Sequence, residues 1–102
     1  MAFKENLAAL PEVQGKRLRL FDGQGREVAA IENAPGTAGS FRVYAHLASR
    51  HGVINADAAQ EGLMLYAEHT EDARLHPGRH PNIDRLLELL QSGGCLEVSL
   101  DL

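Results

Sequence analysis

The sequence predicts an α+β fold, in which a three-stranded antiparallel sheet is covered on one face by three to four helices. Two alternating segments flank a glycine-rich turn, apolar residues recur at helical spacing through the middle of the chain, and the C-terminal segment alternates strictly. The predicted order is α-β-β-α-α-α-β. The 102 residues are 44% apolar and 24% charged, an ordinary globular composition. We therefore predict one domain over residues 1–102.

A β-hairpin is predicted between residues 16 and 32. Leu18 and Leu20 alternate with Arg17 and Arg19, which is typical of a strand with one solvated face. A turn with two glycines follows at 22–25, and residues 27–32 have the composition of a second strand.

Four helices are predicted from apolar residues spaced three and four apart. They cover residues 3–10, a segment that begins at Thr37 or Ser40 and ends at 51, residues 55–75, and residues 81–92. Gly52 is suited to the left-handed cap that ends the second helix. Gly62 interrupts the third helix, at a cost of about 1 kcal/mol relative to alanine.

The last strand is predicted from a strict alternation over residues 96–102. Its polar face carries Glu97 and Asp101, whereas the polar face of the first strand carries Arg17 and Arg19. Opposite charges on neighbouring strands stabilise pairing by roughly 0.2–1 kcal/mol per pair. We therefore expect the last strand beside the first, with the hairpin partner on the other side of the first strand.

The charge and the single cysteine exclude several classes of protein. The net charge of −4 argues against a nucleic-acid partner, because neutralisation of phosphates supplies most non-specific affinity. No apolar run approaches the ~18 residues of a membrane span, and the first six residues lack the apolar stretch of a signal peptide. Cys95 has no partner for an internal disulfide, and we expect it to be a small, partly buried apolar residue. These features predict a cytoplasmic protein without membrane or nucleic-acid partners.

Residues 68–84 hold the densest group of polar side chains. At 100° per residue, His69, Asp72 and His76 lie within about 60° of one another on a helix. His80 follows after a turn and could fold back towards them. Imidazole and carboxylate groups can bind a divalent metal or another ligand, or supply a general acid and base. We predict a ligand site at His69, Asp72, His76, Arg79 and His80; the alternative is a solvated helix face and a capping loop.

A second candidate lies between the second strand and the second helix. Backbone N–H groups at a helix start can bind an anion, and glycines allow close approach. We predict such a site at Gly36, Gly39 and Ser40, with Arg42 able to add charge. The segment lacks the motif of a nucleotide-binding loop, so a plain strand-to-helix connection is the alternative.

Three segments carry a resemblance to a known family: ENAPG at 32–36 through YAHL at 44–47, YAEHTEDAR at 66–74, and HPGRHPNIDRL at 76–86. They resemble a small family of bacterial proteins of about this length, classified only as a domain of unknown function. The resemblance implies a bacterial, stand-alone cytoplasmic protein. It supplies no activity and no functional residues.

Three functions are consistent with this sequence. The first is a non-catalytic interaction or regulatory domain, which could form a homodimer or bind a protein partner through a free sheet edge. The second is a metal- or small-ligand-binding module that uses the cluster around residues 69–80. The third is a small enzyme that uses the same cluster for acid–base chemistry. There is no nucleotide or haem motif, and a divalent metal is the one cofactor that the residues suggest.

Overall fold

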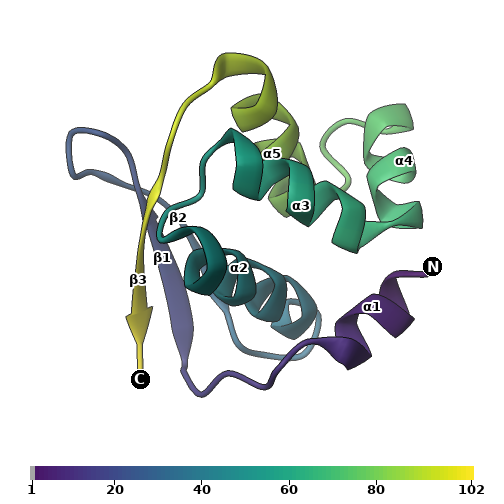
Figure 1. The fold of residues 1–102 in the computed structure, drawn as a ribbon, viewed down its shortest axis with the longest axis horizontal. Helices are drawn as coiled ribbons and strands as arrows, with labels where there is room; N and C mark the ends of the chain where they lie inside the picture. Colours follow the sequence, from purple (N-terminus) through teal and green to yellow (C-terminus); the bar gives the residue numbers. More distant parts are fainter. Residues whose placement is uncertain (1) are drawn as a thin grey trace.

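The computed structural model describes residues 2–102 and contains, within them, five helices and one three-stranded sheet (Figure 1). The elements are α1 (Phe3–Ala9), β1 (Arg17–Phe21), β2 (Glu27–Glu32), α2 (Ala38–His51), α3 (Ala56–Tyr66), α4 (Glu68–Leu75), α5 (Pro81–Ser92) and β3 (Glu97–Asp101). The predicted α+β fold and its order are confirmed, with the third predicted helix divided into α3 and α4.

The sheet has the strand order β2-β1-β3, and both pairs are antiparallel, as the charge pattern predicts. Arg19 Nη2 lies 2.8 Å from Asp101 Oδ2, and Arg17 Nε lies 3.4 Å from Glu32 Oε2. Glu97 differs from the expectation, because it lies opposite Phe21 rather than beside an arginine. The arginines of the central strand are thus held between acidic edge strands.

The helices cover one face of the sheet and enclose a single core (Figure 1). Leu18, Leu20 and Ile31 point from the sheet into this core and are almost completely buried. α2 packs directly on β1 and β2, and α3 lies between α2 and α5. Phe41 and Leu47 of α2 are fully buried at the centre of these layers. The core depends on close contact between α2, α3 and α5.

The predicted helix over 55–75 is wrong at Ala67, where the chain leaves helical geometry with φ 52° and ψ −117°. Ala67 is the only residue other than glycine with a positive φ in residues 2–102. Thr70 Oγ1 donates a hydrogen bond of 2.6 Å to the carbonyl of Leu63, the group that a continuous helix would pair with the Ala67 N–H. The Thr70 hydroxyl therefore satisfies the carbonyl that the break leaves open.

Glu61 links α3 to the last turns of α2 at the surface. Arg50 Nε donates to its carboxylate at 2.9 Å, His51 Nε2 lies 2.8 Å away, and His46 Nε2 lies 3.3 Å away. Burial alone would raise the pKa of Glu61, but the hydrogen bonds from His51 and Arg50 and the charges of Arg50 and His46 outweigh it, so the pKa is lowered.

Glu61→Gln is expected to lower the free energy of unfolding at neutral pH by about 1 kcal/mol. Because folding lowers the pKa of Glu61, its contribution is fully present above the ordinary value of 4.5 and is lost as pH falls through the folded pKa. The difference between wild type and Glu61→Gln in urea unfolding should therefore shrink between neutral pH and about pH 3. The exposed Glu12 supplies the control, since Glu12→Gln should change stability little at either pH. A difference that persists at low pH contradicts this account.

Candidate functional site

The two candidate sites predicted separately from the sequence line one pocket of about 420 Å³. The start of α2, the end of α3, α4 and the loop before α5 all contribute to it, and α1 closes one side. Of the predicted site residues, the lining contains Gly36, Gly39, Ser40, His69, Arg79 and His80. The remaining lining residues are Phe3, Ala38, Tyr66, Pro81, Asn82 and Ile83. We refer to this cavity as the basic pocket.

The start of α2 presents open hydrogen-bond donors to the basic pocket. Thr37 occupies the N-cap position, but its hydroxyl donates to the carbonyl of Glu32 at 2.7 Å and does not cap the helix. Within residues 2–102, the N–H groups of Gly39 and Ser40 have no acceptor. Gly36 has φ 92°, a conformation that favours glycine and lets the chain turn into the helix.

The hydroxyl of Ser40 is a further donor. Tyr66 Oη donates a hydrogen bond of 2.7 Å to Ser40 Oγ, so the proton of Ser40 is left to point elsewhere. Burial raises the pKa of Tyr66, which keeps the phenol protonated at neutral pH. The start of α2 therefore offers two N–H groups and one O–H group.

Asp72 organises the basic side chains on the opposite side. Its Oδ2 lies 2.6 Å from His80 Nε2, and its Oδ1 lies 3.3 Å from Arg79 Nη1. The hydrogen bond with His80, together with the charge of Arg79, lowers the pKa of Asp72 despite some desolvation. The ring of His69 lies 5.7 Å from that of His80, between centroids. Asp72 itself is not part of the pocket lining, so it orients His80 and Arg79 from behind.

Aromatic rings form one wall of the basic pocket, and sequence reasoning missed them. Phe3 stacks on Tyr66 with centroids 5.2 Å apart and meets His69 edge-on at 5.1 Å. The N–H of Phe3 donates to Glu68 Oε1 at 2.8 Å, which fixes the start of α1 against α4. Tyr66 belongs to the predicted apolar stripe, and the need of its buried hydroxyl for a partner was the available signal.

Besides Asp72, three of the residues considered lie outside the pocket. His76 is exposed, lies 3.9 Å from Asp72 and is not among the residues that line the pocket. Arg42 does not add charge at the start of α2, because its Nη2 donates to the carbonyl of Leu10 at 2.6 Å. The expectation for Cys95 is wrong, because the thiol is exposed in the segment between α5 and β3.

Neither a serine–histidine pair nor a metal-binding cluster is present in the basic pocket, as far as the described residues go. Ser40 Oγ is paired with Tyr66, and no histidine in residues 2–102 lies within hydrogen-bond distance of it, so the pocket lacks a serine–histidine pair. No group of three or more His, Cys, Asp or Glu side chains among the described residues is arranged to hold a metal ion. Arg79, moreover, occupies the carboxylate of Asp72 that a metal would need.

These observations define a small α+β protein with a basic, aromatic-walled pocket. No helix within residues 2–102 combines the length and the apolar character needed to cross a membrane. Residues 3–100 match the model of a family described as an uncharacterised protein conserved in bacteria, DUF2322. The chain belongs to this family, which confirms the resemblance of its three segments. Neither the curated proteins nor the solved structures contain a match to the chain.

Proposed function

We propose that the protein is a non-catalytic binding domain whose basic pocket takes a small anionic ligand. The observation that carries this proposal is the lining: it contains His69, Arg79 and His80 but no Asp or Glu from residues 2–102. The chain as a whole contains more acidic than basic side chains and has a net charge of −4. The lining of this pocket therefore differs in charge from the rest of the chain. A volume of about 420 Å³ is within the range of small-molecule sites.

The start of α2 supports the same sign of ligand. The helix dipole places partial positive charge at this end. Because no side chain of residues 2–102 caps the helix, the N–H groups of Gly39 and Ser40 are free to donate hydrogen bonds to an anion. Arg79 supplies a permanent charge opposite the helix start.

A homodimer through the sheet edges receives less support. Both edge strands carry acids, Glu27 and Glu32 on β2 and Glu97 and Asp101 on β3. An antiparallel pair of β3 strands centred on Ser99 would set Glu97 against an aspartate of the second copy, and like charges across a pair are destabilising. This pattern is typical of edges that resist pairing.

The proposal is tested by titrating the protein with inorganic phosphate at constant ionic strength and following backbone amides by NMR. We expect saturable shifts at Gly36, Gly39 and Ser40. Arg79→Gln should weaken binding about tenfold, because it removes a charge-assisted hydrogen bond.

The matched control is Arg74→Gln, which removes the same charge from an exposed position outside the basic pocket. Phosphate affinity should be unchanged in this variant. Equal weakening by both substitutions would mean that phosphate responds only to net charge, and the proposal would be lost. Shifts spread over the surface without saturation would count against it equally.

A further inference from the structure

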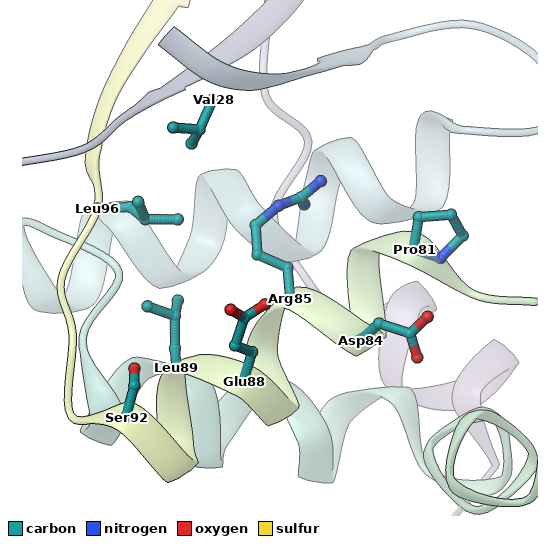
Figure 2. Close-up of a pocket in the computed structure, with 8 residues that line it drawn as sticks. All are labelled: Val28, Pro81, Asp84, Arg85, Glu88, Leu89, Ser92 and Leu96. Atoms are coloured by element: carbon teal, nitrogen blue, oxygen red, sulfur yellow. The ribbon is translucent and has the colours of Figure 1, made fainter. Parts of the chain in front are cut away.

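A second pocket of about 490 Å³ lies between β2, α5 and the segment before β3 (Figure 2). Its walls include the apolar side chains of Val28, Leu89 and Leu96, and Arg85 extends between them and Pro81. None of the sequence-predicted site residues lines this cavity. We refer to it as the apolar pocket.

A β-bulge directs Val28 into the apolar pocket. Leu20 pairs with Ala29 and Phe21 pairs with Glu27, so Val28 is the extra residue of β2. Figure 2 shows the side chain of Val28 in the wall of the pocket, with that of Leu96 nearby. Bulges re-aim side chains in this way. Half of the Val28 surface remains exposed, at 50%, so an apolar group is presented to a cavity that the chain itself does not fill.

Arg85 is held in place but, among the residues that the structure describes, it lacks an anionic partner. Its Nη1 donates to Tyr44 Oη at 3.1 Å and to Asn82 Oδ1 at 2.9 Å, and its guanidinium lies 5.6 Å from the centroid of the Tyr44 ring. These two bonds use both protons of Nη1. The Nε–H and one Nη2–H form the parallel fork that binds a carboxylate through two bonds. Within residues 2–102, no carboxylate lies within 4.0 Å of the guanidinium.

The acidic side chains in the lining limit the charge of a ligand. Asp84 and Glu88 both line the apolar pocket, and Asp84 already accepts a hydrogen bond from the Gly78 N–H at 2.9 Å. A lining that holds two carboxylates and one guanidinium disfavours a dianion such as phosphate, whereas Arg85 can pair with a single carboxylate.

We propose that the apolar pocket binds a small monocarboxylate with a branched apolar tail. The carboxylate pairs with the Nε and Nη2 edge of Arg85, and the tail packs between Val28, Leu89 and Leu96. A simple branched-chain acid and a branched-chain amino acid share this chemistry. They differ in the ammonium group, which Asp84 and Glu88 of the lining would attract. The site is separate from the basic pocket and does not depend on anion binding there.

The test is an NMR titration of the full chain with 4-methylpentanoate, acetate and leucine, following methyl groups. We expect 4-methylpentanoate to shift Val28, Leu89 and Leu96 and to bind at least about tenfold more tightly than acetate, because its tail buries apolar surface. Leucine binding at the same residues identifies the amino acid as the source. Leucine failing where 4-methylpentanoate binds identifies the simple acid.

Two substitutions make the test specific. Val28→Asp puts a negative charge at the pocket wall on an exposed position and should reduce affinity by about tenfold or more. Ala30→Asp adds the same charge two residues along β2, outside the pocket lining, and should leave affinity unchanged. Arg85→Lys keeps the charge but removes the fork and should also weaken binding. The proposal is overturned if acetate binds as tightly as 4-methylpentanoate, or if Val28→Asp has no more effect than Ala30→Asp.

Discussion

Replacing Gly62 by valine is expected to lower the free energy of unfolding by about 3 kcal/mol, the upper range for overpacking a core. A Cβ at this position would lie 2.7 Å from Leu86 Cδ1 and 2.8 Å from Leu47 Cδ1. Both leucines are fully buried, so neither side chain can swing towards solvent to make room. Gly62 is therefore the point at which α3 approaches α2 and α5.

Gly62→Ala is the informative smaller step, because two effects oppose each other. Alanine favours the helix by about 1 kcal/mol relative to glycine, whereas the same Cβ contacts disfavour it. We expect the contacts to prevail and the protein to be less stable. The control is Gly39→Ala in α2, whose Cβ would meet Leu7 and Phe3 at 3.4 Å and should be tolerated. Urea unfolding of the variants decides the matter, and a more stable Gly62→Ala would refute this reading of the helix contact.

Gly62 also illustrates where sequence reasoning reaches its limit. Helical periodicity identifies Gly62 as an interruption with a propensity cost, which is a local property. Its role in packing depends on Leu47 and Leu86, which are distant in sequence and belong to other helices. No local pattern places these three positions together.

The sheet was predictable for the opposite reason. Alternation along each strand is local, and the charges of Arg19 and Asp101 identify which strands are neighbours even though 82 residues separate them. The pairing follows from a simple electrostatic rule, and the strand order β2-β1-β3 confirms it.

The basic pocket was predictable only in parts. The donors at Gly39 and Ser40 follow from a strand-to-helix connection, and His69 and His80 follow from a polar segment. Their convergence depends on how α2 packs against α3 and on the break at Ala67, neither of which has a strong sequence signal. The helical spacing places His76 on the face of His69, but α4 ends at Leu75, and His76, with φ −133° and ψ 72°, lies outside the pocket lining.

Thr70 stabilises the break at Ala67. We therefore expect Thr70→Val to lower the free energy of unfolding by about 2 kcal/mol. Valine has nearly the same shape as threonine, but it leaves the buried carbonyl of Leu63 without the 2.6 Å hydrogen bond that it now accepts. An unsatisfied buried acceptor costs roughly 1–3 kcal/mol. The matched control is Thr37→Val, because the hydroxyl of Thr37 bonds an exposed carbonyl that water can satisfy instead. Its effect should be clearly smaller.

Ala67→Gly should shift stability in the other direction. The conformation with φ 52° and ψ −117° strains any residue with a Cβ by about 1–3 kcal/mol, whereas glycine adopts it freely and loses about 1 kcal/mol through the greater entropy of its unfolded chain. A net gain of about 1 kcal/mol is expected in urea unfolding. Phosphate binding should persist in Ala67→Gly, because the break that brings His69 to the basic pocket is kept. A loss of stability in this variant, or a Thr70→Val protein as stable as Thr37→Val, would indicate that α3 continues through Ala67, and the geometry of the basic pocket would have to be redrawn.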